Sequence, residues 1–288
     1  MMNFSRTLNE SSNLKIIIFG AGEITNLLIK DLTLNGQKVL CVTDNSFGQL
    51  NGIVHNNLET VTYKDVINSK LEFNIAIFTW RDLGRLNQDN KALLGWLKSE
   101  KFQVSKSFFL SSASVYKHSA KLHSEESEVI DGNVKVMLEK SLKDLSIKKK
   151  ILHTDLRISN VYGVGISHGF IGSLLDSIKT GSKIQLFQNL HTTRDYIYVE
   201  DVVYAIKMLL KIDNHQNCIN ISTGIGITLS ELLEYFSYEG FNFENRQYLF
   251  DNLKVREVSI LDCSILASLI NWQPRKLSSV LKKMLGTI

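Results

Sequence analysis

The stretch Leu14–Thr25, LKIIIFGAGEIT, decides the fold of this chain. Its first part, residues 14–19, is a short apolar run with the length and composition of a buried strand. Two closely spaced glycines follow, and apolar residues then recur at the spacing of one helix face up to Gly36, which supplies a helix stop. The segment therefore predicts a strand, a tight turn and a helix in direct succession.

Strands and helices continue to alternate after this first unit. β-rich or apolar runs follow at 38–43, 74–79, 108–111, 151–158, 196–199 and 218–221, and helical patterns at 134–145 and 202–210. A capping box at Thr228–Glu231 predicts one further helix. Repeated βα units imply a parallel sheet with helices on both faces, so we expect an α/β fold with a doubly wound parallel sheet.

The pattern also predicts how the chain is divided. We expect residues 14–165 and 194–225 to form the sheet domain, and residues 166–193 and 226–288 to form a smaller, interleaved C-terminal portion. Residues 1–13 are polar and carry no hydrophobic signal core, so they are interpreted as a polar leader.

Composition excludes several classes of protein. The net charge is +4 without a basic block, and Lys148–Lys150 is interpreted as a solvated turn, so we expect no nucleic-acid partner. Three isolated cysteines predict neither a metal site nor a disulfide framework, and they fit a reducing compartment. No apolar run approaches the roughly 20 residues that span a bilayer. We therefore expect a cytoplasmic protein without a membrane segment.

The glycine turn has the chemistry of an anion site. Gly20 permits the tight turn, and Gly22 lets a diphosphate approach the N–H groups at the start of the helix, although Thr25 replaces the third glycine of the usual pattern. Asp44 ends the second strand near the expected distance of about 20 residues, where a carboxylate binds a ribose and repels a 2′-phosphate. This pattern favours NAD over NADP. The alternative is a plain turn, with Asp44 capping a loop.

Four further segments carry a resemblance to a known family. They are Leu110–Tyr116 (LSSASVY), Asn160–Gly163 (NVYG), Arg194–Asp201 (RDYIYVED) and Asn220–Gly224 (NISTG). Their order and sequences resemble those of the extended short-chain dehydrogenases, NAD-dependent epimerases and dehydratases that act on nucleotide sugars. The resemblance implies a Rossmann-type fold with a substrate-binding C-terminal portion. It also implies binding of NAD and of a nucleoside-diphosphate sugar, and a homodimer.

The resemblance assigns roles to individual residues. Ser112 matches the family residue that binds the sugar oxygen, with a strand-end cap as the alternative, and Lys135 matches the lysine that holds the nicotinamide ribose, with a solvated helix lysine as the alternative. Arg194 matches an arginine that binds the substrate diphosphate, with an ion pair to Asp195 as the alternative. The full cofactor set expected is Gly20, Gly22, Glu23, Ile24, Asp44, Asn45, Thr79 and Lys135, and the substrate set is Asn160, Arg194 and Arg256.

The main departure from the family pattern is at the catalytic tyrosine. The position four residues before Lys135 holds Asp131. A carboxylate beside a lysine stays ionised at neutral pH and is a poor proton donor, and its side chain is much shorter than that of tyrosine. We interpret Asp131 as a helix N-cap, with a catalytic carboxylate as the alternative. Tyr116, His118 and His123 are further candidates for the acid/base, and the spacing singles out none of them.

Two functions are consistent with these residues. The first is an enzyme, an NAD-dependent nucleotide-sugar epimerase, dehydratase or reductase that transfers hydride at a sugar carbon. The second is a catalytically impaired Rossmann-fold binding or regulatory protein, because Asp131 replaces the family tyrosine.

Overall fold

The larger layer of the protein is a parallel β-sheet. The computed structural model describes residues 14–43, 60–68, 72–80, 88–180, 182, 190–213, 215–238 and 258–285. Within them, seven parallel strands lie in the order β3-β2-β1-β4-β5-β6-β9, which confirms the expected sheet. The strands are β1 (Lys15–Phe19), β2 (Lys38–Thr43), β3 (Thr60–Thr62), β4 (Ile75–Phe78), β5 (Lys106–Ser112), β6 (Leu152–Ile158) and β9 (Cys218–Ile221).

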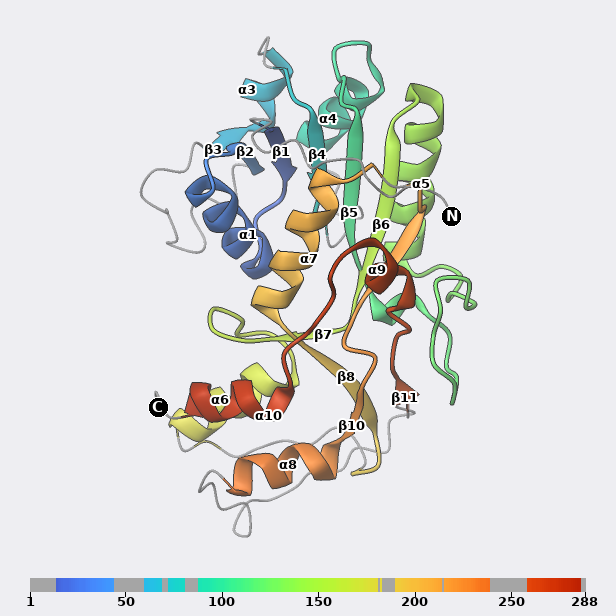
Figure 1. Cartoon of the computed structure of the whole chain (residues 1–288). Coiled ribbons are helices and arrows are strands. Elements are labelled where there is room, and N and C mark those ends of the chain that lie inside the picture. The colour runs from blue at the N-terminus through green and yellow to red at the C-terminus, as the bar shows by residue number, and fades with distance from the viewer. Residues whose placement is uncertain are drawn as a thin grey trace.

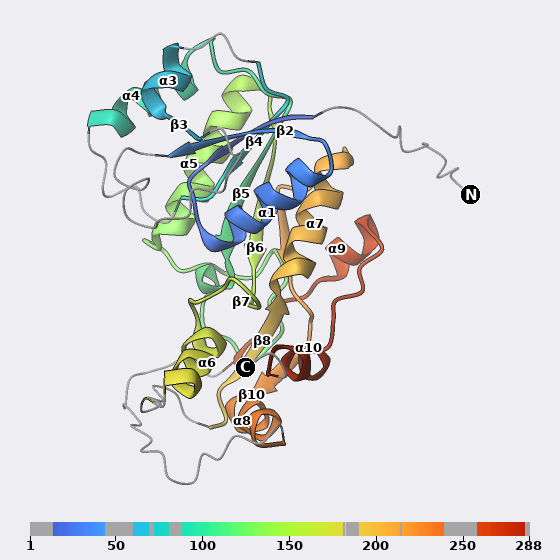
Figure 2. The ribbon, with the colours of Figure 1, turned by 90° about the vertical axis from the view of Figure 1, so that its left-hand side faces the viewer.

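Helices cover both faces of this sheet (Figures 1 and 2). Because side chains alternate along a strand, Ile16 and Ile18 of β1 enter the core with α1 (Glu23–Leu34) and α7 (Val199–Lys211). Ile17 and Phe19 enter the opposite core, with α3 (Tyr63–Asn68), α4 (Gln88–Lys98) and α5 (Val134–Lys149). An apolar run buried on both sides is what a central parallel strand requires, and the doubly wound α/β fold is confirmed.

A second, smaller layer lies at the end of the large sheet where β5 and β6 terminate (Figure 1). Its central strand β8 (Thr193–Tyr198) pairs in parallel with β7 (Asn160–Tyr162) and β11 (Val258–Ser259), and antiparallel with β10 (Gly226–Thr228). Its core is completed by three helices, α6 (Phe170–Thr180), α8 (Leu229–Tyr238) and α10 (Leu277–Leu285).

The two layers are interleaved along the chain. β7 and β8 belong to the smaller sheet, whereas β9 returns to the large one. The short helix α9 (Ser264–Leu269) contributes Leu266 to the core that α1 and α7 form with the large sheet. The predicted division at 165, 194 and 225 therefore does not coincide with sheet membership at every boundary, and the domain limits stay a prediction. The predicted leader lies outside the described residues.

Local capping explains where two helices begin. The capping box before α8 is confirmed, because the Thr228 hydroxyl accepts from the Glu231 N–H at 3.2 Å while the Glu231 carboxylate accepts from the Thr228 N–H at 2.7 Å. The expected N-cap role of Asp131 is wrong. The cap of α5 is Asn133, whose side chain accepts from the Lys135 N–H at 2.9 Å. Gly132, with φ of +76°, turns the chain between Asp131 and the helix.

The described part of the chain also shows whether a helix could span a membrane and whether the cysteines are paired. None of its helices combines the length and the apolar character needed to cross a bilayer. All three cysteines of the sequence fall within the described ranges, and all three are thiols rather than disulfides.

Candidate active site

A cavity of about 320 Å³ lies where the strand ends of the large sheet meet the smaller sheet. In doubly wound folds, ligands bind beyond the carboxyl ends of the parallel strands. The cavity is lined by Ser112, Ala113, Ser114, Tyr116, His118, Ile130, Ile158, Ser159, Asn160, Arg194 and Ser259. The cavity therefore brings together five of the candidate residues named from the sequence: Ser112, Tyr116, His118, Asn160 and Arg194.

Ser112 is the last residue of β5 and lines the cavity. Its Oγ accepts from the Ser114 N–H at 3.2 Å and so caps the short 3₁₀ helix at Ala113–Val115. The hydroxyl hydrogen is not used by this bond, because the oxygen acts as the acceptor. Ser112 thus caps the backbone and still has a donor to offer a ligand oxygen.

Arg194 and Asn160 form the opposite wall. Arg194 donates from Nη1 to the carbonyl oxygen of Thr193 at 2.9 Å, and burial lowers the pKa of its guanidinium. Asn160 donates from Nδ2 to the carbonyl oxygen of Asp195 at 3.0 Å.

The carboxylate of Asp195 takes other partners than Arg194. It accepts hydrogen bonds from the Thr223 hydroxyl at 2.7 Å and from the Gly224 N–H at 2.9 Å, and it is completely buried. Neighbours along a strand point to opposite faces, so Asp195 fastens β8 to the loop after β9 while Arg194 remains on the cavity side.

The glycine turn lies at the same end of the large sheet, between β1 and α1. Gly20 has φ of +106°, and a Cβ atom there would lie 2.5 Å from Oγ1 of Thr79. Thr79 itself donates to the carbonyl oxygen of Phe19 at 3.0 Å, so it supports the turn from β4. A Cβ atom on Gly22 would meet only Oγ1 of Thr25, at 3.9 Å. Gly20 is required by the protein's own packing, whereas Gly22 faces open space at the helix N-terminus.

Glu23 and Ile24, in the first turn of α1, are engaged within the protein. Glu23 accepts from the Ser167 N–H at 3.1 Å and also from the Ser167 hydroxyl. Burial pushes the pKa of Glu23 up, but the hydrogen bonds from Ser167 outweigh burial and leave the pKa below its ordinary value. Ile24 is half-buried and touches both the large and the small core. Asp44, Asn45 and Arg256 lie outside the described residues.

Lys135 reaches the strand end that carries Ser112. Its Nζ donates to the carbonyl oxygen of Leu110 at 2.9 Å and lies 5.3 Å from the centre of the Phe109 ring. The side chain is half-buried, so it is not the solvated helix lysine of the alternative interpretation. Lys135 therefore places a cation beside the end of β5.

The candidate acid/base residues have different surroundings. Asp131 is exposed and is not among the residues that line the cavity. Tyr116 is buried and donates from its hydroxyl to Oδ1 of Asn220 at 2.6 Å, and burial raises the pKa of the phenol well above its usual range. His123 is buried and stacks on Tyr116 with ring centres 5.0 Å apart. His118 is exposed and lines the cavity.

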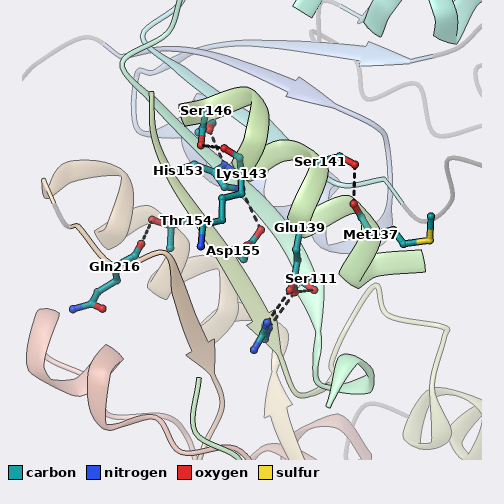
Figure 3. A network of polar contacts seen from close by, with 12 residues as sticks. Ser111, Met137, Glu139, Ser141, Lys143, Ser146, His153, Thr154, Asp155 and Gln216 are labelled. Carbon is teal, nitrogen blue, oxygen red and sulfur yellow. Dashed lines mark hydrogen bonds and ion pairs between the residues drawn. The ribbon is translucent and has the colours of Figure 1, made fainter. Parts of the chain in front are cut away.

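A buried polar network between β5, β6 and α5 was missed by the sequence analysis (Figure 3). Arg157 of β6 binds Glu139 of α5 through Nη2 at 2.8 Å and Nε at 3.1 Å, and Ser111 donates to the same carboxylate at 2.5 Å. A glutamate on the buried face of α5, four residues after Lys135, was the available signal. Ser159 and Ser259 of the cavity wall had no such signal, because only the fold brings them to the site.

The fold and the site define a class of protein. A doubly wound parallel sheet with a glycine turn after β1 and a polar cavity beyond β5 and β6 is a Rossmann-type architecture. Residues 88–222 match the model of the NAD dependent epimerase/dehydratase family. The resemblance found in the sequence is therefore confirmed for this part of the chain. The family model does not include the glycine turn at Gly20 and Gly22, so that turn is supported by the structure and not by the family model.

One curated relative and two solved structures are similar to this chain. A dTDP-4-dehydro-6-deoxyglucose reductase from Escherichia coli is 33% identical over 116 residues, which are 39% of this chain and 37% of that protein's length. The UDP-glucose 4-epimerase of Thermotoga maritima, solved with UDP-glucose, has a TM-score of 0.79 at 23% identity and covers 95% of this chain and 98% of its own. The dTDP-glucose 4,6-dehydratase DesIV from Streptomyces venezuelae, solved with NAD and TYD bound, has a TM-score of 0.78 at 13% identity, with 95% and 96% covered. At these identities the two structures establish the fold.

Proposed function

We propose that this protein is an enzyme that binds NAD and a nucleoside-diphosphate sugar and transfers hydride at a sugar carbon. The observation that carries the proposal is the position of Ser112, Asn160 and Arg194 around one polar cavity at the carboxyl end of the parallel sheet. The proposed reaction is an epimerisation, a dehydration or a reduction. The expected setting is cytoplasmic.

The residues present at the glycine turn fit a dinucleotide. Gly22 is the N-cap of α1 and has no side chain to cap the helix, and the space where its Cβ would lie is open. The first N–H groups of a helix lack partners within the helix and favour an anion, so this turn suits a diphosphate. Lys135 lies beside the end of β5, where the proposal places the nicotinamide ribose. When bound, NAD supplies the hydride acceptor and donor. The preference for NAD over NADP depends on Asp44 and stays part of the proposal.

The cavity residues suit the substrate in a similar way. A guanidinium binds phosphate oxygens in pairs and keeps its charge, so Arg194 is proposed to hold the substrate diphosphate. Ser112 is proposed to donate its hydroxyl hydrogen to the sugar oxygen that reacts. Asn160 is held by its bond to the Asp195 backbone and lines the same cavity as these two groups.

The second candidate is a binding or regulatory protein that keeps the fold and the ligands but not the chemistry. One observation favours it. Asp131 replaces the family tyrosine, is exposed, and does not line the cavity. Under this alternative the protein binds both ligands without turnover.

The test is calorimetry and a turnover assay with the whole chain. We expect heat on adding NAD, UDP-glucose or dTDP-glucose, and a change in nicotinamide absorbance or in the sugar product. Arg194→Gln should weaken nucleotide-sugar binding more than tenfold and leave NAD binding unchanged. Arg275→Gln is the matched control, because Arg275 pairs with Glu200 outside the cavity. Absence of binding to all three ligands contradicts the proposal, and binding without turnover favours the second candidate.

A homodimer is also proposed. Val134 and Met137 of α5 are 42% and 56% exposed, and Ile147 on the same helix is 65% exposed. An apolar helix surface of this kind is typical of an interface. Sedimentation of the wild type and of Met137→Glu should give a dimer and a monomer, and a monomeric wild type contradicts this part of the proposal.

A further inference from the structure

We propose that His118 is the catalytic residue that gives and takes the proton at the reacting sugar oxygen. It would replace the family tyrosine, whose position in this chain holds Asp131. The inference rests on the proposed function. It starts from the wall of the cavity, where three side chains can carry a proton or a charge: Tyr116, His118 and Arg194.

Two of these three groups are unsuited to proton exchange. An arginine keeps its charge at any physiological pH, so Arg194 is a poor acid and a poorer base. Tyr116 donates its hydroxyl hydrogen to Oδ1 of Asn220 at 2.6 Å, and burial of the side chain disfavours the phenolate form. Imidazole, by contrast, is the side chain whose two forms are both accessible near neutral pH.

Hydrogen bonds of the backbone hold the segment that leads to His118, one of the residues that line the cavity. The segment that leads to it forms a short ladder with the segment before α5. The Ile130 N–H donates to the Val115 carbonyl oxygen at 2.7 Å, and the Lys117 N–H donates to the Glu128 carbonyl oxygen at 2.8 Å. His118 is the next residue after this ladder. It lines the cavity together with Ile130, whose N–H takes part in the ladder.

The same ladder also explains why Asp131 is not placed to exchange a proton with the sugar oxygen. Ile130 lines the cavity, while its neighbour Asp131 is exposed and enters the turn at Gly132. Lys117, the residue before His118, is paired with Glu128 at 2.9 Å, and Arg194 lines the same cavity as His118. Asp131 adds a negative charge near Lys117.

In the oxidative direction, the carbon–hydrogen bond breaks and its hydride passes to NAD, while the hydroxyl proton passes to a ring nitrogen of neutral His118. The sugar carbon becomes a ketone. In the reductive direction, the protonated imidazole returns the proton to the oxygen as the hydride returns to carbon. Ser112 donates a hydrogen bond to the same oxygen and changes no charge.

The first test is His118→Asn, which keeps a polar side chain of similar reach. We expect turnover to fall about 100-fold or more, the size of a lost general acid/base, with UDP-glucose and dTDP-glucose affinity within about threefold of the wild type. His215→Asn is the matched control, because His215 is also exposed but lies at the opposite end of β6, where that strand begins. Turnover of His118→Asn equal to that of the control overturns the inference and leaves the proposed function standing.

A second readout does not depend on turnover. In protein with ¹⁵N-labelled histidine, the His118 ring signals are identified by their absence in His118→Asn. We expect UDP-glucose to shift them and to leave the His215 signals in place. Signals of His118 that stay unmoved under saturating UDP-glucose overturn the inference. If neither NAD nor any nucleotide sugar binds, the proposed function fails first, and the assignment of His118 fails with it.

Discussion

Glu139 and Arg157 join α5 to β6 through a two-point ion pair next to Tyr116, which lines the cavity. Nη2 of Arg157 lies 2.8 Å from one carboxylate oxygen and Nε lies 3.1 Å from the other, and the two side chains are 9% and 7% exposed for Arg157 and Glu139. The guanidinium also lies 4.8 Å from the centre of the Tyr116 ring, whose hydroxyl binds Asn220. The pair therefore connects the lysine-bearing helix with the wall of the site.

Breaking this pair should strongly destabilise the protein. Arg157→Met leaves the carboxylate of Glu139 buried without its cation, and the loss expected for such a buried pair is about 3–5 kcal/mol in the free energy of unfolding. Urea denaturation measures it. Glu128→Gln is the control, because the Lys117–Glu128 pair is exposed and should contribute little. Equal denaturation midpoints for the two variants would contradict the structural role assigned to Arg157.

The two glycines of the first turn should separate stability from binding. Gly20→Ala places a Cβ atom 2.5 Å from Oγ1 of Thr79 at a φ of +106°, so we expect a loss on the order of 1–3 kcal/mol in the free energy of unfolding. Gly22→Ala meets no close atom and has an extended backbone, so stability should stay nearly unchanged while NAD affinity falls more than tenfold. Thermal unfolding and calorimetry give both quantities. Undiminished NAD binding by Gly22→Ala would exclude this turn as the diphosphate site.

Buried tyrosines should make the protein sensitive to alkali. Burial raises the pKa of Tyr196 to about 12 and raises the pKa values of Tyr116 and Tyr162 further. Above pH 10 the unfolded chain releases these protons and the folded chain retains them, so the free energy of unfolding falls as pH rises, by about 1.4 kcal/mol per pH unit for each group. Denaturation at several pH values measures this slope. Tyr116→Phe should make it shallower, and an unchanged slope would contradict the burial of that hydroxyl.

The capping box of α8 should give a dependence on acid pH. Hydrogen bonds from the backbone and the hydroxyl of Thr228 lower the pKa of Glu231, so this stabilisation is present above the ordinary pKa of a glutamate and is lost as pH falls through the lowered value. Thr228→Ala should cost about 1 kcal/mol at neutral pH and less at acid pH, and Thr228→Ser should cost little. Urea denaturation at neutral and acid pH tests this, and a cost for Thr228→Ala that does not vary with pH contradicts it.

Much of the large sheet could be predicted because its signals are local. The strands at Lys38–Thr43 and Cys218–Ile221 have the predicted bounds, since each is an apolar or β-rich run bounded by polar residues. The cap of α5 was predicted wrongly for a related reason. Asp131, Gly132 and Asn133 are all turn formers, and only the backbone conformation at Gly132 shows that Asn133 is the residue that caps the helix.

The candidate site was predictable only in part. Ser112, Asn160 and Arg194 stand in motifs and were predicted. The motifs do not reveal that the Asp195 carboxylate accepts hydrogen bonds from Thr223 and Gly224. The sequence offered three equally suitable candidates for the acid/base: Tyr116, His118 and His123. The structure separates them, because exposure and hydrogen bonding depend on segments far away in the chain.

The sequence by itself determined the order of strands and helices, the glycine turn and the family segments, because each depends on residues that are near neighbours along the chain. The tertiary structure alone decided which polar groups share a cavity and which are buried in hydrogen bonds within the protein. Arg157 meets Glu139, Tyr116 meets Asn220, and His118 reaches the cavity wall through contacts that only packing creates. Burial and partner choice are properties of the folded chain, since they arise from segments that are distant in sequence.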